Sequence, residues 1–312
     1  MKILLTGKNG QVGWELQRTL APLGEVVAVD RRTLDLGNPD SIRSVIREVK
    51  PDLIVNPAAY TAVDKAESEP ELAMAVNGVA PGVMAEEAKR LGAAMIHYST
   101  DYVFDGTKTS PYTEEDIPNP INVYGKTKLA GEQAIQAAGI PHLILRTSWV
   151  YGARGKNFLL TILRLAKERD ELKIVDDQIG APTWSRMIAE ATAQILAQSV
   201  LPLTPHASLL TQYSGVYNLA AAGQTSWCGF AKAILESMAP QGAYPSLIIH
   251  HPLPKLIPIS TAEYPLPAPR PLFSLLARDK LSRTFGMKLP NWDDSLVLCM
   301  AETGQVSVVS TT

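Results

Sequence analysis

The sequence contains little cysteine and no long apolar run. Cys228 and Cys299 are the only cysteines among 312 residues, too few and too unpatterned for a disulfide framework or a zinc site, which fits a reducing compartment. Gly7 and Lys8 interrupt the first apolar stretch, so no secretion signal is expected, and no later run reaches the roughly 18 residues of a membrane span. We therefore expect a cytoplasmic protein with no membrane partner.

An excess of positive charge is also missing. Lys and Arg number 29 against 31 Asp and Glu, which gives a net charge of −2. That balance does not favour binding to nucleic acid, whose backbone attracts clustered cations. Nucleic acid is therefore not an expected partner.

The chain opens with a pattern typical of dinucleotide binding. An apolar run at residues 2 to 6 leads into three glycines, Gly7, Gly10 and Gly13, and then into a helical pattern over residues 14 to 23. Gly7 would allow the tight turn, Gly10 the approach of a pyrophosphate to the helix N-terminus, and Gly13 close helix packing. A plain αβ turn with the same glycines is the alternative.

The second strand indicates which nucleotide could bind. The run at residues 26 to 29 ends at Asp30, where an acid receives ribose hydroxyls in a dinucleotide site. Arg31 and Arg32 follow, and because arginines favour a 2′-phosphate that the acid disfavours, NADH and NADPH both stay open as cofactors. Asp35 and Leu36 could close over the adenine, or Asp35 could be a turn or helix-cap residue.

Small residues and hydroxyls follow the next two strands. Ala58, Ala59, Tyr60 and Thr61 come after a strand at residues 53 to 56, where they would let a cofactor lie against backbone. A helical region at about residues 70 to 91 then leads to a strand at 94 to 98.

Ser99 and Thr100 follow that strand. A hydroxyl there could donate to a substrate carbonyl in the same crevice as the glycine turn. Alternatively, both hydroxyls bond to local backbone.

Tyr124 and Lys128 are the candidate catalytic pair. Of the ten tyrosines only Tyr124 has a lysine four residues later, which puts both side chains on one face of a helix. A neighbouring ammonium favours the phenolate and would lower the pKa of Tyr124. Tyr124 could then give a proton to a carbonyl oxygen as hydride reaches the carbon. An amphipathic helix with a solvated lysine is the alternative.

The order of these segments predicts an α/β fold, a doubly wound parallel sheet of Rossmann type with a smaller α/β C-terminal substrate-binding lobe. We expect six βα-type units by about residue 150. The predicted limits are 1–155 for the dinucleotide-binding domain, to which later segments could return, 156–303 for the lobe and 304–312 for a frayed tail. In the second half we expect strands at 142–146, 172–175 and 215–219, and helices at 157–169, 186–198 and 226–238.

Two further residues are candidate substrate contacts. Trp149 could stack on a sugar or base, or it could fill the core. Arg270 lies in a segment with eight prolines between positions 245 and 271, which is expected to be extended and to wall a cleft. A guanidinium on stiff backbone suits a diphosphate, and a solvated surface arginine is the alternative.

Six blocks of sequence resemble the extended short-chain dehydrogenase/reductases, in order over roughly residues 1 to 300. The resemblance implies an NADPH- or NADH-dependent reductase that delivers hydride to C4 of a keto-deoxysugar carried on dTDP, a precursor for cell-surface polysaccharide. The blocks are Leu4–Glu15, Thr61–Glu67, His97–Phe104, Asn122–Glu132, Arg146–Tyr151 and Asp177–Thr183.

The resemblance also implies roles. Tyr124 would be the proton donor, Lys128 its electrostatic partner and a ligand of the nicotinamide ribose, and Thr100 the second donor to the carbonyl. Asp101 and Trp149 would contact the deoxysugar nucleotide, with Arg270 on its diphosphate. The dinucleotide would be held by Gly10, Gln11, Val12, Asp30, Asp35, Leu36, Ala59, Tyr60 and Thr61; Gly7, Gly13, Arg31, Ala58 and Ser99 complete the candidate set.

One departure from the family concerns metal. Some members carry a dimer-bridging magnesium held by glutamates; Glu15 matches one ligand, but the others align with Arg186 and Asp293. An arginine in such a site would repel the ion. We therefore expect no metal, and both a monomer and a homodimer stay open.

Two other functions stay open. One is an extended reductase or epimerase that acts on a different sugar nucleotide. The other is a non-catalytic relative, similar to the regulatory β-subunit of methionine adenosyltransferase, which shares this fold and binds a partner enzyme. Thr100, Tyr124 and Lys128 argue against the second.

Overall fold

The computed structural model describes residues 1–199, 210–238 and 253–303. The predicted loop at 201–210, apart from Leu210, and the tail at 304–312 lie outside these ranges. Within them, no helix has both the length and the apolarity to cross a membrane.

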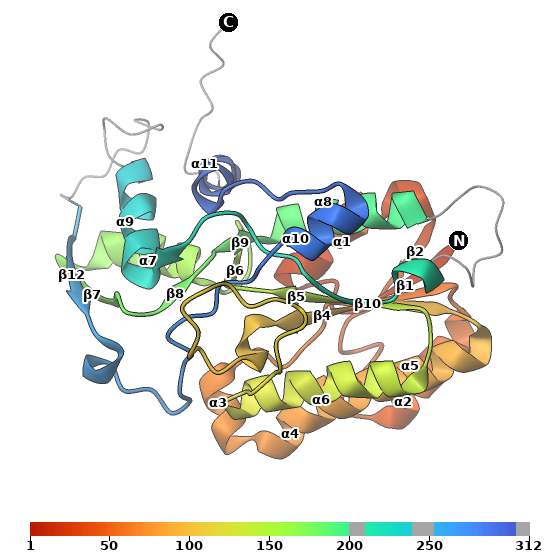
Figure 1. Ribbon diagram of the computed structural model, residues 1–312. Coiled ribbons are helices and arrows are strands. Elements are labelled where there is room, and N and C mark those ends of the chain that lie inside the picture. The colour runs from red at the N-terminus through yellow and green to blue at the C-terminus, as the bar shows by residue number, and fades with distance from the viewer. Residues whose placement is uncertain (200–209, 239–252, 304–312) are drawn as a thin grey trace, which may run out of the picture.

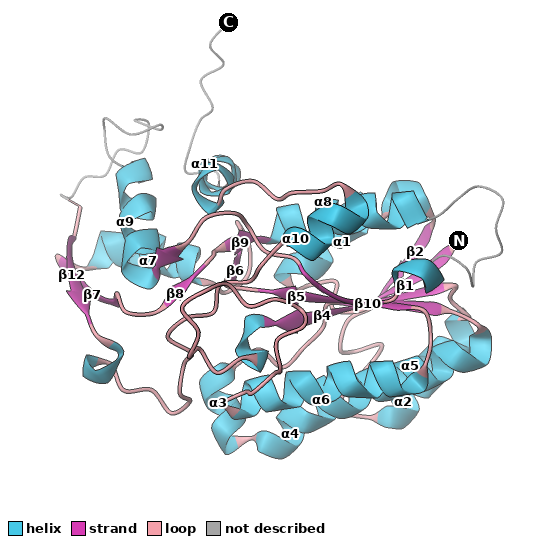
Figure 2. Ribbon diagram, viewed as in Figure 1, coloured by secondary structure: helices cyan, strands magenta, loops and turns pink. Residues whose placement is uncertain are grey.

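The chain alternates strands and helices (Figure 2). The strands are β1 (Lys2–Leu5), β2 (Glu25–Ala28), β3 (Leu53–Asn56), β4 (Ala94–Thr100), β5 (His142–Thr147), β6 (Val150–Tyr151), β7 (Glu171–Val175), β8 (Ile179–Gly180), β9 (Thr183–Trp184), β10 (Gly215–Asn218), β11 (Thr225–Ser226) and β12 (Lys255–Ile259). The α-helices are α1 (Gln11–Thr19), α2 (Pro39–Val49), α3 (Val63–Ser68), α4 (Pro70–Met74), α5 (Ala80–Leu91), α6 (Val123–Ala138), α7 (Phe158–Glu168), α8 (Ser185–Ser199), α9 (Trp227–Met238), α10 (Asp279–Phe285) and α11 (Trp292–Glu302). Short helical turns are η1 (Ala21–Leu23), the π-helical η2 (Ala75–Val79), η3 (Asp101–Val103), η5 (Thr211–Tyr213) and η6 (Thr261–Glu263).

Six parallel strands form the central sheet, in the order β10-β5-β4-β3-β1-β2. The chain runs from β1 out to β2 and returns to β3 on the other side of β1, and such a reversal opens a crevice at the carboxyl ends of the strands. The predicted doubly wound fold is confirmed. The predicted count was wrong, because only five strands of this sheet precede residue 150 and the sixth, β10, comes from residues 215–218.

Helices cover both faces of the sheet (Figure 1). Leu16 of α1, Ile188 of α8 and Phe285 of α10 are buried against one face. On the other face, residues of α2, α5 and α6, including Ile42 and Ile135, form a second buried layer. Each fully buried Leu, Ile or Phe adds about 1.5–3 kcal/mol of hydrophobic stabilisation, so both layers hold the strand ends rigidly in place.

A smaller lobe lies beside the carboxyl edge of the sheet (Figure 2). There β7 pairs with β12 in parallel, and α7, α9 and α11 pack around Phe230 and Trp184. The proline-bearing segment 265–271 runs back from this lobe to the start of α6, where Asn122 Nδ2 donates to the carbonyl oxygen of Pro269 at 2.9 Å. The lobe and the sheet are thereby joined at the helix that carries Tyr124.

Candidate active site

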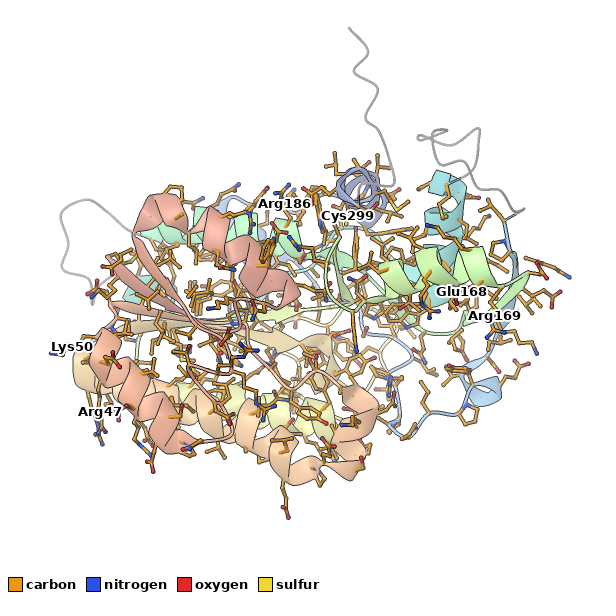
Figure 3. All side chains as sticks on the ribbon, turned by 180° about the vertical axis from the view of Figure 1, so that it is seen from behind. Arg47, Lys50, Glu168, Arg169, Arg186 and Cys299 are labelled. Carbon is orange, nitrogen blue, oxygen red and sulfur yellow. The ribbon has the colours of Figure 1, made fainter. Side chains whose placement is uncertain are left out.

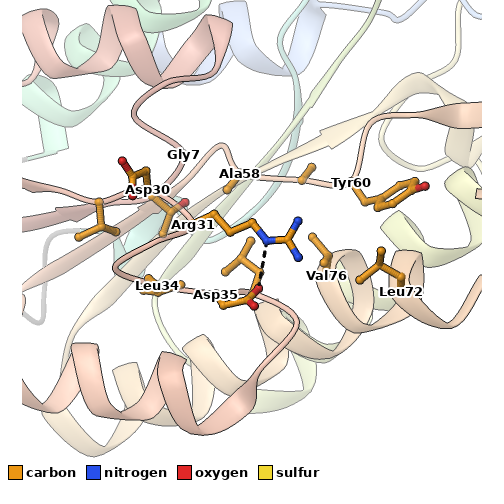
Figure 4. Close-up of a pocket in the computed structure, with 13 residues that line it drawn as sticks. Gly7, Asp30, Arg31, Leu34, Asp35, Ala58, Tyr60, Leu72 and Val76 are labelled. Carbon is orange, nitrogen blue, oxygen red and sulfur yellow. Dashed lines mark ion pairs between the residues drawn. The ribbon is translucent and has the colours of Figure 1, made fainter. Parts of the chain in front are cut away.

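A cavity of about 210 Å³ lies at the strand-order reversal. Its walls come from the residues that follow β1, β2 and β3, together with one face of α4 and η2 (Figure 4). Eight candidate cofactor residues line it: Gly7, Asp30, Arg31, Asp35, Leu36, Ala58, Ala59 and Tyr60. Thr6, Val29, Leu34, Leu72 and Val76 complete the lining, and the sequence analysis had not selected them.

The start of α1 forms the phosphate end of this site. Gly7 has φ 59°, and a Cβ there would lie 2.9 Å from that of Ala58, so only glycine fits without strain. A Cβ on Gly13 would lie 2.1 Å from the carbonyl oxygen of Gly7. No side chain caps the helix at Gly10, which leaves the first N–H groups and the positive end of the helix dipole for an anion.

Gln11 and Val12 lie in the first turn of α1, outside the cavity lining. Gln11 Oε1 accepts a hydrogen bond from Asn157 Nδ2 at 2.8 Å, and this contact ties the loop after β6 to the glycine turn. Thr61 is exposed beyond the loop that follows β3, and buried Ser99 has no hydrogen-bond partner for Oγ within the described ranges.

The far end of the cavity carries charge. Asp30 accepts hydrogen bonds from Arg32 N at 3.0 Å and Asn9 Nδ2 at 3.3 Å, and the Arg32 contact is the main reason why the pKa of Asp30 is lowered. Arg31 reaches Asp35 at 3.6 Å. Asp35 also accepts from the backbone N–H of Gly37 at 3.0 Å, so it is a turn residue as well as part of the cavity wall.

Asn77 holds the loop after β3 and was missed by the sequence analysis. It lies in the π-helical turn η2, a feature often found at functional sites. Its side chain accepts from Tyr60 N at 2.8 Å and donates to Tyr60 O at 3.0 Å and to Thr127 at 3.2 Å. The buried Asn77 side chain therefore fixes the cofactor loop relative to α6.

The start of α6 is fixed from several sides. Asn122 Oδ1 accepts from Gly125 N at 2.8 Å as the helix cap. Glu67 Oε1 accepts from Val123 N at 2.8 Å. A Cβ on Gly125 would lie 2.1 Å from the carbonyl oxygen of Tyr102, so glycine allows α6 to approach η3 closely. Tyr124 thereby meets Tyr102 edge to face, with ring centroids 5.8 Å apart.

The phenol of Tyr124 is largely removed from solvent. Burial raises its pKa to about 12, the Thr100 hydroxyl opposes this rise, and the charge of Asp101 adds to it. The predicted lowering of this pKa by Lys128 was wrong for this structure. The reason is geometric, because the ammonium of Lys128 is directed at Tyr98 O, 2.6 Å away, and at His97 Nε2, 3.2 Å away.

Lys128 is a buried cation. Its exposed fraction is 2%, which excludes the alternative of a solvated lysine. Burial lowers its pKa from 10.5 to about 8, and the nearby Glu132 carboxylate opposes the shift. Glu132 is itself bound by Arg146 in a buried bidentate pair at 2.6 and 3.0 Å.

Thr100 and Asp101 lie at the carboxyl end of β4. Thr100 Oγ1 donates to Asp101 Oδ1 at 3.0 Å and accepts from Tyr102 N at 3.1 Å. Burial raises the pKa of Asp101 to about 7, and the hydroxyls of Ser274 and Thr100 oppose the shift. This end of β4 thus offers a hydroxyl and a readily protonated carboxyl beside Tyr124.

A second cavity, of about 510 Å³, lies between the sheet and the smaller lobe. Arg270 lines it, and its guanidinium pairs with Asp64 at 2.8 Å and with Ala268 O at 2.7 Å. The alternative of a solvated arginine is excluded, since the side chain is 13% exposed. The rest of the lining is Tyr102, Phe158, Thr161, Ile162, Leu165, Lys173, Ile174, Val175, Gln178, Trp227, Thr261, Tyr264, Pro265, Leu266, Ala268 and Pro269.

Trp149 does not line that cavity. Its backbone has φ 47°, and its ring stacks on Trp227 with centroids 3.6 Å apart. The ring is also close to Gly180, where a Cβ would lie 2.5 Å from Cε2 of Trp149. Trp227, which presents its ring to the cavity and donates from Nε1 to Gln178 at 3.1 Å, was missed, because no motif links residue 227 to the site.

Arg186 occupies the region that the sequence analysis had considered for a metal. It contacts Glu15 at 3.5 Å and Glu190 at 3.9 Å, and it also pairs with Glu302. Figure 3 places Arg186 of α8 toward Cys299 of α11. Across the part of the chain that the structure describes, no three His, Cys, Asp or Glu side chains form a group that could hold an ion.

A glycine turn at a strand-order reversal, together with the half-buried Tyr124 and the buried Lys128 on α6, defines the class: a Rossmann-type short-chain dehydrogenase/reductase of the extended kind. Residues 1–305 of the 312-residue chain match the family described as the RmlD substrate binding domain. The chain therefore belongs to the dTDP-4-dehydrorhamnose reductase family.

Similar proteins cover almost the full length. A dTDP-4-dehydrorhamnose reductase of Burkholderia thailandensis is 52% identical over 97% of this chain and 99% of its own length. The enzyme of the same name from Escherichia coli is 46% identical over 94% of each chain. The crystal structure of the Bacillus anthracis dTDP-4-dehydrorhamnose reductase in complex with NADP is 34% identical, covers 97% of this chain and 99% of its own, and superposes with a TM-score of 0.85.

Proposed function

We propose that the protein reduces dTDP-4-dehydro-β-L-rhamnose at C4 to dTDP-β-L-rhamnose, the reduction step of dTDP-L-rhamnose biosynthesis. The observation that carries the proposal is the position of Tyr124. This half-buried phenol lies beside Thr100 and against Tyr102, a residue that lines the larger cavity. A substrate in that cavity would bring its ketone to Tyr124.

The residues around the smaller cavity fit NADPH or NADH. The uncapped start of α1 suits the pyrophosphate, and Asp30 and Arg31 stand at the ribose end. Gln11, Val12 and Gly13 would support the pyrophosphate turn, while Ser99 and Thr61 would flank the nicotinamide half. When bound, the cofactor supplies a hydride to the ketone carbon.

The chain's own contribution is a proton and its placement. Tyr124 gives its phenolic proton to the carbonyl oxygen at C4. The Thr100 hydroxyl, which donates to Asp101 in this structure, would turn to donate to the same oxygen as negative charge develops there. The ketone plus hydride plus this proton gives the alcohol. Lys128, whose ammonium is directed at Tyr98 O and His97 in this structure, is proposed to act by binding the nicotinamide ribose. Solvent then restores the proton.

The larger cavity would hold the sugar nucleotide. Arg270 is proposed to bind the diphosphate through its planar fork, which suits phosphate oxygens. Asp101, at the end of β4, would orient the deoxysugar hydroxyls. Trp149 is proposed to act from behind Trp227, so that Trp227 and Phe158 offer apolar surface to the dTDP moiety.

The division into a dinucleotide-binding domain at 1–155 and a substrate-binding lobe at 156–303 stays a prediction. We also propose that the reaction takes place in the cytoplasm, which both described cysteines, free in this structure, would suit. The protein would act as a monomer or homodimer, with no nucleic acid or membrane partner.

The test is turnover by the purified chain alone. We expect oxidation of NADPH or NADH with dTDP-4-dehydro-L-rhamnose, and much slower oxidation with 4-keto sugars carried on UDP or GDP. Equal rates with a different nucleotide sugar would point to another extended reductase. Intact cofactor binding without turnover of any 4-keto sugar nucleotide would point to a regulatory relative.

A further inference from the structure

A row of buried polar side chains crosses the sheet beneath the proposed active site. Asn56 of β3 pairs in register with His97 of β4, and Thr6 follows β1 on the other side of Asn56. Thr6 Oγ1 is 2.6 Å from Asn56 Oδ1, and Asn56 Nδ2 is 3.1 Å from His97 Nδ1. Each of these three residues is at most 1% exposed. An apolar residue, Ile144, stands opposite His97 on β5 and ends the row there.

The row joins two parts of the site. Thr6 lines the smaller, cofactor-sized cavity. At the other end, His97 Nε2 is 3.2 Å from Lys128 Nζ. Buried polar groups without a functional partner are rarely retained in the interior of a parallel sheet, because each one has to be satisfied by another. The catalytic lysine is therefore connected to the cofactor wall through three side chains that the mechanism above does not use.

The donors and acceptors in this row depend on one another. An ammonium can only donate, so a charged Lys128 requires a lone pair on His97 Nε2. A neutral imidazole with that lone pair carries its proton on Nδ1 and donates it to Asn56. The oxygen of the Asn56 amide must then face His97, and its NH₂ group must face Thr6.

The structure itself carries the opposite amide orientation, with Asn56 Nδ2 toward His97 and Asn56 Oδ1 toward Thr6, and this orientation has a different consequence. If Asn56 Nδ2 donates to His97 Nδ1, the imidazole carries its proton on Nε2 and presents it to Lys128. Lys128 could accept that proton only as a neutral amine. Turning the Asn56 amide by 180° exchanges its oxygen and nitrogen without moving any other atom. The orientation of the Asn56 amide therefore determines whether Lys128 is an ammonium or a neutral amine.

Two observations favour the charged lysine. Lys128 Nζ lies 2.6 Å from the carbonyl oxygen of Tyr98, a length typical of a charge-assisted bond. Burial lowers the pKa of Lys128 to about 8, and the carboxylate of Glu132, one turn further along α6, opposes this shift, so the ammonium still predominates near neutral pH. A doubly protonated His97 is excluded, since burial and the charge of Lys128 hold the pKa of His97 well below its usual value. The titratable groups that face Lys128 are thus His97 from β4 and Glu132 from its own helix, with Tyr124 one turn earlier.

We propose that His97 is a positioning residue, held by Asn56 and Thr6 in the tautomer with its proton on Nδ1, so that its Nε2 accepts from Lys128 and keeps that residue an ammonium. The row then acts on the reaction through Lys128 and not by touching the substrate. Loss of the acceptor would leave the desolvation of Lys128 less compensated and would favour its neutral form. The effect on turnover rests on the proposed function, but the tautomer does not.

The tautomer can be measured without turnover. In protein labelled with ¹⁵N-histidine, the resonances of His97 are assigned by their absence from His97→Gln. We expect a protonated Nδ1 and an unprotonated Nε2 near neutral pH, in the free chain and with NADPH added. A proton on Nε2 would overturn the proposal even if the enzyme is fully active.

The pH profile of kcat tests the effect on Lys128. In His97→Leu the alkaline limb should move to lower pH by about one unit, the size expected when a cation loses one hydrogen-bond acceptor. His97→Gln places an amide oxygen at the position of Nε2 and should restore most of that shift.

The matched control is Tyr98→Phe. Tyr98 is the next residue on β4, and its hydroxyl bonds to Thr192 at 2.7 Å on the opposite face of the sheet. Its substitution removes a buried hydrogen bond, yet it should leave the alkaline limb in place. An unmoved limb in His97→Leu, or equal shifts in His97→Leu and Tyr98→Phe, would contradict the proposal. If His97→Leu does not fold, the tautomer measurement on the unaltered chain decides.

Discussion

Arg270 and Asp64 form an ion pair, 2.8 Å between Nη2 and Oδ2, although 206 residues separate them in the chain. Asp64 lies in α3, beside the loop that lines the cofactor cavity, while Arg270 belongs to the proline-bearing segment that walls the larger cavity. Arg270 Nη1 donates to Ala268 O as well. The guanidinium is thus oriented by two partners, and this pair joins the walls of the two cavities.

Arg270→Lys should weaken binding of the sugar nucleotide. A lysine keeps the charge but loses the planar fork that contacts Asp64 and Ala268 together. We expect KM for the dTDP-sugar to rise about tenfold, equivalent to one lost interaction of about 1.4 kcal/mol, with kcat nearly unchanged. Initial-rate kinetics measure both. Lys255→Ala, which removes an exposed cation outside the cavity lining, is the control and should leave KM unaltered.

Tyr124→Phe should abolish most turnover without loss of cofactor affinity. The substitution keeps the ring that packs edge to face on Tyr102 and removes only the proton donor. Loss of a general acid lowers the rate by about 10²- to 10⁴-fold. Single-turnover rates and NADPH titration measure the two effects separately. Tyr102→Phe, which also loses one hydroxyl, should remain within a few-fold of the unaltered enzyme; retained activity in Tyr124→Phe would refute the role of the phenol.

Asp101 should make stability depend on pH in the opposite sense to an ordinary aspartate. Burial raises its folded-state pKa from 3.8 to about 7, so the folded state binds the proton more tightly than the unfolded state. Its contribution is fully present below pH 3.8 and is lost as pH rises through about 7. As pH rises from 3.8 to about 7, the free energy of unfolding should fall by an amount on the order of a few kcal/mol.

Thermal unfolding across pH 4 to 8 tests this expectation. Asp101→Asn cannot ionise, so its melting temperature should fall less over this range than that of the unaltered chain. Asp177→Asn, at an exposed carboxylate of the smaller lobe, is the control. Parallel curves for Asp101→Asn and the unaltered protein would show that Asp101 is not protonated in the fold.

Arg31→Ala should change the choice of nicotinamide cofactor. The side chain of Arg31 is 79% exposed and reaches over the mouth of the cavity toward Asp35 (Figure 4). A 2′-phosphate would attract it, whereas a free ribose hydroxyl would prefer Asp30. We expect KM for NADPH to rise about tenfold, the effect of one lost charge-assisted contact, and KM for NADH to change little. Equal changes for both cofactors would contradict a contact with the phosphate.

Chelation should leave the enzyme unaffected. The guanidinium of Arg186 already pairs with Glu15, Glu190 and Glu302, so these carboxylates have a counter-ion and a divalent cation would be repelled. Activity and the solution mass, measured before and after treatment with EDTA, should be the same. A fall in either quantity that magnesium reverses would show that a metal does bind.

Local sequence patterns were sufficient to predict the strands, the glycine turn and the helical face shared by Tyr124 and Lys128. Gly7, Gly10 and Gly13 are informative because backbone space at a strand-to-helix turn restricts the residue type, and the four-residue spacing of Tyr124 and Lys128 requires only helix geometry. The same local reasoning predicted a strand at residues 215–219 but not its place as the sixth strand of the central sheet. β10 is short, and nothing within residues 215–218 indicates which edge of the sheet it joins.

Contacts between distant segments could not be read from the chain. Three contacts join residues that lie between 17 and 206 positions apart: the stack of Trp149 on Trp227, the hydrogen bonds of Asn77 to the Tyr60 backbone, and the pair of Arg270 with Asp64. Periodicity reports which face of an element is buried, but it does not identify the partner on the other side. These partners were therefore missed or left as alternatives.

The type of fold, the nucleotide turn and the shared helical face of Tyr124 and Lys128 could be predicted from the chain alone, because each depends on residues that are near neighbours in the sequence. The environment of the Tyr124 phenol could not be predicted in this way. Burial raises the pKa of Tyr124, and the folding of β4 against α6 directs the Lys128 ammonium to Tyr98 and His97. Desolvation and hydrogen-bond direction depend on atoms brought from elsewhere in the chain, and spacing along one helix cannot specify them.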